Sequence, residues 1–116
     1  MPRARSATLL PALALLLAVL AVLTVSAAPM QDRSATVVIA DGQFNPAHVT
    51  VLAGETVTWV NRDQRDHSVV ADDGSFSSGN LKPGQSFSHR FTSPGTIGYR
   101  CPLHPRERGS VTVKQP

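Results

Sequence analysis

The stretch "VTVLAGETVTWVN", residues 49–61, is the clearest indication of the fold class. Before the turn signal Gly54-Glu55, Val49 and Val51 share one face while His48 and Thr50 share the other, and Val57 and Trp59 repeat this alternation after it. Successive side chains of a strand point to opposite faces, so this period of two is typical of half-buried strands. The stretch therefore predicts two short strands joined by a turn.

The rest of the chain continues this pattern outward on both sides. No window has the period of a long amphipathic helix, and no internal repeat is visible. Short β-branched or aromatic runs separated by Gly, Pro and Asp turn signals are typical of a β-sandwich or barrel. The further predicted strands are "ATVVIA" (35–40), "HSVVA" (67–71), "SFSHRFT" (86–92), "TIGYRC" (96–101) and "SVTVK" (110–114).

The N-terminal segment indicates export. Arg3 and Arg5 precede an uncharged apolar run from Ala7 to Val25, and small residues follow. This order is typical of a secretory signal peptide, which we expect over residues 1–27; an uncleaved membrane anchor is the alternative. A polar lead-in (28–34) and one domain (35–116) would follow, in the periplasm or outside the cell.

Charge and cysteine content narrow the function classes. Without the signal the chain has nine Lys and Arg and eight Asp and Glu, a net charge of +1 in place of the full chain's +3. That balance gives no support to nucleic-acid binding. The single cysteine cannot form an internal disulfide, so it is a free thiol, an intermolecular link or a metal ligand.

The segment "YRCPLHPRERG", residues 99–109, gives that cysteine possible partners. His104 follows Cys101 by three residues and Glu107 follows it by six, and His67 opens a distant predicted strand. A thiolate with two imidazoles is the donor set of electron-transfer copper sites, which add a weak axial ligand. The same donors also suit zinc.

Three segments resemble the cupredoxins, the small blue-copper proteins, and most closely the amicyanin and plastocyanin group. They are "FNP" with "VTVLAGETVTWVN", "DHSVVADDGSFSSG", and "YRCPLHP" closing into "GSVTV". The resemblance spans roughly residues 36–114. It implies a Greek-key β-sandwich or barrel of about seven to eight strands, one copper ion per chain held by His67, Cys101 and His104, and transfer of single electrons without an organic cofactor.

At the axial position the sequence departs from this family. Its short ligand loop has methionine six residues after the cysteine, where this chain has Glu107. A carboxylate is a harder, anionic donor, so binding through Glu107 would favour Cu(II), lower the potential and shift the thiolate absorption. Alternatively, Glu107 turns to solvent beside Arg106 and Arg108 and leaves three ligands.

Other polar residues receive more ordinary interpretations. We expect His48 to be solvated and His89 to be a structural, hydrogen-bonded histidine facing inward. Asp63 and Asp66 are expected to be loop charges, although one of them could accept a hydrogen bond from a ligand imidazole. The resemblance implies that the Ser68 amide donates to the Cys101 sulfur.

The sequence therefore predicts an exported, monomeric copper electron carrier and not an enzyme. Its redox partner would dock near His104, on an apolar patch of Pro102, Leu103 and Pro105, and the two nearby arginines would favour an acidic partner. No nucleic acid is expected as a partner, and a membrane only if the N-terminal segment stays uncleaved. Copper storage or delivery and a Cys-His₂-Glu zinc site remain alternatives.

Overall fold

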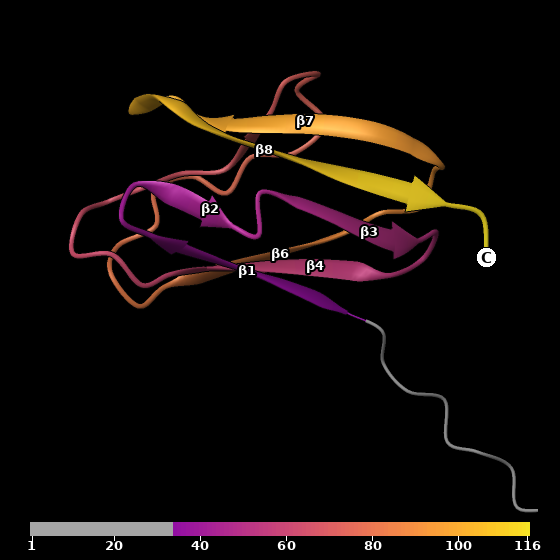
Figure 1. The fold of residues 1–116 in the computed structure, drawn as a ribbon, viewed down its shortest axis with the longest axis horizontal. Coiled ribbons are helices and arrows are strands. Elements are labelled where there is room, and N and C mark those ends of the chain that lie inside the picture. The colour runs from indigo at the N-terminus through magenta and orange to yellow at the C-terminus, as the bar shows by residue number, and fades with distance from the viewer. Residues whose placement is uncertain (1–33) are drawn as a thin grey trace, which may run out of the picture. The chain divides into compact units, whose positions relative to one another are not determined.

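A computed structural model describes residues 34–116, which form eight strands and no helix (Figure 1). The predicted signal peptide and nearly all of the lead-in lie outside these residues. Within the described part, nothing forms a helix that could cross a membrane. The strands are β1 (Ala35–Ala40), β2 (Gln43–Asn45), β3 (His48–Leu52), β4 (Thr56–Asn61), β5 (Val70–Ala71), β6 (Ser86–Arg90), β7 (Gly95–Cys101) and β8 (His104–Lys114).

The strands form two four-stranded sheets, in the orders β2-β1-β4-β6 and β3-β8-β7-β5. Figure 1 shows β7 and β8 in a layer apart from β1, β4 and β6. β1 runs parallel to β4 and β3 runs parallel to β8, whereas the other pairs are antiparallel. The predicted all-β sandwich is therefore confirmed, with both sheets mixed.

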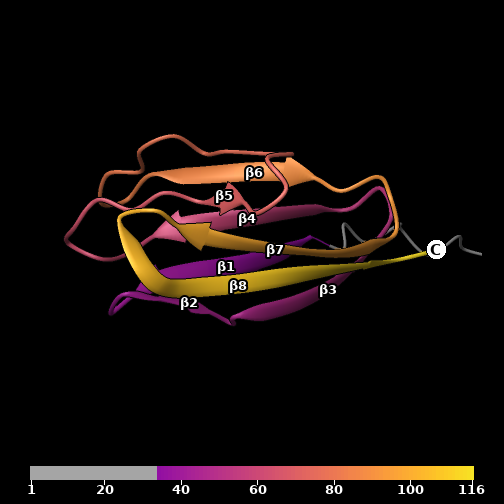
Figure 2. The same ribbon diagram turned by 90° about the horizontal axis from the view of Figure 1, so that it is seen from above.

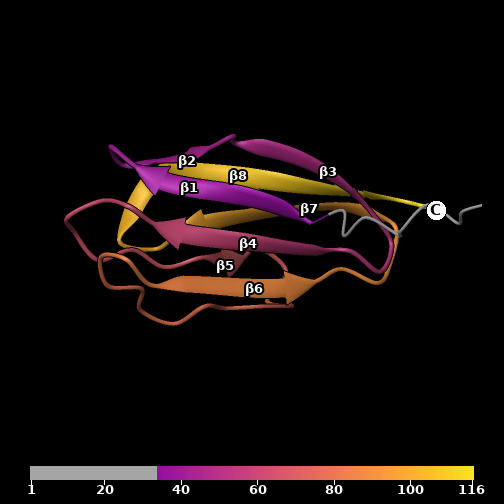
Figure 3. The same cartoon turned by 90° about the horizontal axis from the view of Figure 1, so that it is seen from below.

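Residues 49–61, from which the fold class was predicted, divide between the two sheets. Gly54, at φ 98°, turns the chain as expected, but β3 pairs with β8 whereas β4 lies between β1 and β6. In the view from below, β4 and β3 run on opposite sides of β1 (Figure 3). The turn thus closes the sandwich at one end instead of forming a hairpin.

Alternating side chains of both sheets fill the space between them. Trp59 is fully buried and contacts aromatic rings from both sheets: its ring centroid lies 5.3 Å from that of Tyr99 and 5.8 Å from that of Phe87. The period-two pattern predicted this inward face. The packed core gives the loops at its end a rigid base.

The largest differences from the sequence prediction concern three strands. β2 was not predicted, although Asp41-Gly42 is a strong hairpin signal; both residues have positive φ, as a two-residue turn of this kind requires. β8 begins at His104 and not at residue 110, because its first residues pair with β7. β5 contains only Val70–Ala71 of the predicted 67–71 strand.

Candidate metal centre

The β7–β8 hairpin brings Cys101 and His104 together. Pro102 and Leu103 form the turn, and Cys101 pairs directly with His104 across it. A register shift between Arg100 and Cys101 accompanies the tight turn. Cys101 is fully buried and His104 is half-buried, and the pairing of their backbones places the histidine beside the thiol.

His67 reaches the same place from the loop after β4. Its backbone is fixed to Leu81 by two hydrogen bonds, 3.0 Å from the His67 amide and 2.7 Å to the His67 carbonyl. The side chain is fully buried, and its ring centroid lies 4.8 Å from that of His104. Two imidazoles from different parts of the chain therefore lie next to each other.

Glu107 completes a group of four donors. One ligand atom from each of His67, Cys101, His104 and Glu107 lies within 4.8 Å of all the others. Glu107 points inward and is buried, so the orientation toward solvent that the sequence left open is not the one observed. All four predicted site residues are therefore brought together; whether they bind a metal is taken up below.

The surroundings of the Glu107 carboxylate suit a bound cation. Its Oε2 lies 3.0 Å from His67 Nδ1, but the two are not aligned as a hydrogen bond, and Nδ1 and both carboxylate oxygens are buried without hydrogen-bond partners. Burial raises the pKa of Glu107 above its usual value, against the opposing effect of His67 and His104. A buried carboxylate is costly unless something compensates its charge, and a metal ion would do so.

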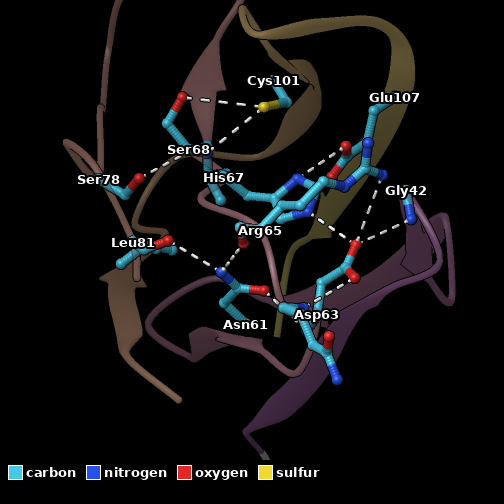
Figure 4. Close-up of polar contacts among 12 residues, drawn as sticks. Gly42, Asn61, Asp63, Arg65, His67, Ser68, Ser78, Leu81, Cys101 and Glu107 are labelled. Atoms are coloured by element: carbon cyan, nitrogen blue, oxygen red, sulfur yellow. Dashed lines mark hydrogen bonds and ion pairs between the residues drawn. The ribbon is translucent and has the colours of Figure 1, made fainter. Parts of the chain in front are cut away.

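Asp63 holds the opposite edge of the His67 ring (Figure 4). Its Oδ2 lies 2.9 Å from His67 Nε2 and also accepts a hydrogen bond of 3.2 Å from the Gly42 amide. The hydrogen bond from His67 lowers the pKa of Asp63, so the carboxylate stays charged. Nε2 is thereby occupied and Nδ1 is directed at the other donors, which is how a carboxylate orients a metal-binding imidazole.

Asn61, for which the sequence indicated no role, fixes this loop. Its amide nitrogen donates to the carbonyls of Arg65 (2.8 Å) and Leu81 (2.9 Å), and its Oδ1 accepts from the Asp63 amide at 2.9 Å. Asn61 is fully buried with these bonds made. The available signal was its position: it continues the inward face of Val57 and Trp59, where a polar residue needs partners.

The thiol has a single backbone donor near it. The Ser68 amide lies 3.4 Å from the Cys101 sulfur, as the resemblance implied (Figure 4). Such a hydrogen bond to a ligand sulfur tunes a metal's reduction potential. The residue after one candidate ligand thus contacts another, which links the two loops.

Other predicted polar residues lie away from the four donors. His48 is exposed as expected, with Nδ1 2.6 Å from Ser110 Oγ. His89 is half-buried and stacks on Phe76 at 4.8 Å between ring centroids. Asp66 is exposed and accepts a hydrogen bond from Asn80. Of the two loop aspartates, only Asp63 therefore contacts a candidate ligand.

The fold and the donor set together define a class of protein. A thiol, two imidazoles and a carboxyl group, three of the four side chains buried, lie together at one end of a β-sandwich and are donors that could hold one metal ion. Comparison with known protein families agrees: residues 13–113 match the cupredoxin-like domain. The chain belongs to this family.

Individual relatives and solved structures agree with that assignment. The chain is 39% identical over 84 residues to plastocyanin of Scenedesmus fuscus, covering 61% of this chain and 86% of that protein. It is 34% identical to amicyanin of Paracoccus denitrificans, and that match covers 77% of this chain and 72% of the amicyanin. A purple cupredoxin from Nitrosopumilus maritimus superposes with TM-score 0.65 and 31% identity, covering 69% of this chain and 99% of that one. The structure of a Cu(I) form of an amicyanin variant superposes with TM-score 0.66 and 34% sequence identity. That match covers 74% of this chain and 87% of the amicyanin chain.

Proposed function

We propose that this protein is an exported electron carrier with one copper ion, bound by His67, Cys101 and His104, with Glu107 as the fourth ligand. The observation that carries the proposal is the convergence of these four donor atoms within 4.8 Å. Membership of the cupredoxin-like family supports copper as the metal. Bound there, copper would supply one-electron chemistry between Cu(I) and Cu(II).

The chain's own residues would keep the ligands in place during that exchange. Cys101 and His104 are joined across a two-residue turn, and His67 is fixed by Leu81 through its backbone and by Asp63 through its ring. A carrier loses least energy when its ligands rearrange little between the two oxidation states. The paired strands and the buried loop supply that rigidity.

The half-exposed His104 is the natural route for electrons. Among the four donor residues it alone is not buried. Leu103, next to it, is the one large apolar residue of the described chain that is exposed. A redox partner would therefore approach the site at the β7–β8 turn.

Spectroscopy of the purified protein titrated with Cu(II) tests this function. We expect one equivalent to give a thiolate-to-copper band and an EPR signal of a mononuclear site, and ascorbate to bleach both reversibly. A site that takes up zinc and gives no thiolate-to-copper band with Cu(II) would overturn the proposal.

The buried carboxylate favours a second candidate, copper storage or delivery. Glu107 is a hard anionic donor and prefers Cu(II), which makes a shuttle between oxidation states less effective. Two measurements separate the candidates. A carrier exchanges electrons rapidly with small redox reagents and retains copper against a chelator; a delivery protein loses copper to the chelator without fast exchange.

A further inference from the structure

The surface beside the β7–β8 turn has an uneven distribution of charge. Arg106 and Arg108 are exposed on β8, on either side of the buried Glu107. Arg100 on β7 pairs directly with Arg108 in the sheet, and paired residues of neighbouring strands share a face. Three arginine side chains therefore lie on the outer side of this hairpin; we call them the arginine face.

Within residues 34–116, one carboxylate forms ion pairs with the arginine face. Asp72, in the turn after β5, lies 2.9 Å from Arg100 and 4.0 Å from Arg108. Among the described residues no ion pair includes Arg106. Asp73 follows in the chain, but in the described part of the chain it forms no ion pair with these arginines, and its carboxylate instead accepts a hydrogen bond from the Ser75 amide. Counting Asp72, the arginine face keeps two positive charges in excess.

Overall charge does not explain this excess. Residues 34–116 contain eight Lys and Arg and seven Asp and Glu, a net charge of +1. The loop 62–66, which carries Asp63 to the same site, has two arginines and two aspartates and is neutral. Positive charge is thus concentrated on one side of the candidate electron route.

Apolar surface lies directly next to these charges. Leu103 is 58% exposed at the tip of the hairpin, and Pro102 and Pro105 beside it are exposed. An apolar centre with a charged rim is the arrangement of a protein docking surface: the centre loses water on contact, and the rim charges guide encounter.

From this arrangement we infer that the docking surface is the Leu103 tip together with the arginine face, and that it selects a redox protein whose docking face is acidic. The inference rests on the proposed electron-transfer function. Its occupant follows from charge complementarity, because like charges would repel a basic partner while aspartates and glutamates could pair with Arg106 and Arg108.

Oxidation of the copper(I) protein by reagents of opposite charge tests the inference. Ferricyanide, an anion, takes one electron from the protein and becomes ferrocyanide; tris(phenanthroline)cobalt(III), a cation, is reduced to cobalt(II). At low ionic strength we expect Arg106→Gln to slow the ferricyanide reaction roughly three- to tenfold and Asp72→Asn to speed it, with the cobalt reagent showing the opposite changes.

Lys114→Gln is the matched control. It changes net charge by the same amount, but Lys114 ends β8 and His104 begins it, about 33 Å away at the usual rise of a strand (Figure 2). In water, a unit charge that far away interacts only weakly with the anion even without screening, so less than about a twofold change is expected. Equal responses of Arg106→Gln and Lys114→Gln would overturn the inference, because only net charge would then matter.

Hexacyanochromate(III) locates the anion without any electron transfer. Added to the isotope-labelled, metal-free protein, this paramagnetic anion should broaden the amide NMR signals of Leu103, Arg106 and Arg108. Broadening centred on residues 62–66, or spread evenly, would overturn the inference. If neither redox reagent reacts with the protein while this map is as expected, the proposed function fails and the anion-binding surface stands.

Discussion

The imidazole of His67 lies between two carboxylates, with Nδ1 3.0 Å from Glu107 Oε2 and Nε2 2.9 Å from Asp63 Oδ2. The two acids have different environments. Asp63 is partly exposed and its charge is satisfied by hydrogen bonds, whereas both oxygens of Glu107 are buried without such partners. One carboxylate therefore orients the ring, and the other is available to a cation.

Replacing Glu107 by glutamine should raise the reduction potential of the copper protein. Glutamine keeps the shape and removes the negative charge that favours Cu(II) over Cu(I). Each tenfold change in that preference is about 59 mV for one electron, so we expect a rise of roughly 60–120 mV in cyclic voltammetry. A parallel shift of the thiolate absorption should accompany it.

Asp66→Asn is the control for this potential. It also removes one negative charge from the same end of the domain. The Asp66 side chain, however, is exposed and accepts a hydrogen bond from Asn80. Solvent screens such a charge, so little change is expected. An unchanged potential and spectrum in Glu107→Gln would show that Glu107 is not a ligand.

The metal-free protein should lose stability as pH rises above about 4.5. Burial raises the pKa of Glu107 above its usual 4.5, so the folded state binds this proton more tightly than the unfolded state does. The stabilisation is fully present below 4.5 and is lost as pH rises through the folded value. Urea unfolding with excess chelator should show Glu107→Gln gaining stability relative to wild type between pH 4 and pH 7. A constant difference would contradict this.

The candidate ligands were predictable because three of them lie within seven residues of one another. Cys101, His104 and Glu107 are close in the chain, so their spacing alone indicates a common site. His67 could be added because the donor chemistry calls for a second imidazole and the resemblance supplies its position. The orientation of Glu107 was left open, because inward or outward depends on where β8 starts pairing with β7.

The support around the ligands could not be predicted in the same way. Asp63 and Asp66 both precede His67 in one polar loop, and nothing local distinguishes them. The distinction comes from Asn61 and from Gly42, whose amide reaches Asp63 across 21 residues of chain. The assignment of β3 and β4 to different sheets likewise depends on pairing with distant strands.

Removing the Asp63 carboxylate should weaken metal binding while leaving all four candidate ligands present. In Asp63→Asn the hydrogen bond to His67 Nε2 loses its charged acceptor, so the ring is less firmly oriented and a poorer donor. Loss of such a partner typically costs about 10- to 100-fold in metal affinity. Competition with a calibrated chelator measures the affinity of each variant for Cu(II). Asp66→Asn is again the control, and equal losses in both variants would contradict a specific role for Asp63.

Gly109→Ala should destabilise the domain by crowding the buried layer around Tyr99. A Cβ at Gly109 would lie 2.6 Å from the Ala47 carbonyl oxygen and still closer to the Tyr99 hydroxyl. Both neighbours are held firmly, since Tyr99 is fully buried and the Ala47 carbonyl accepts the Ser110 amide. Overpacking of this kind costs about 1–3 kcal/mol, which the urea midpoint of the metal-free protein would report.

Gly98→Ala gives the matched comparison, because Gly98 pairs with Ser110 and its neighbour Tyr99 pairs with Gly109. A Cβ at Gly98 would also meet an atom at close range, but that atom belongs to the exposed Asp72 carboxylate. A flexible side chain can move aside, whereas backbone and a buried ring cannot. The alanine at 109 should therefore cost clearly more stability than the alanine at 98. Equal urea midpoints for the two variants would contradict this, because the buried residues around Tyr99 would then accommodate a methyl group as readily as the exposed Asp72 does.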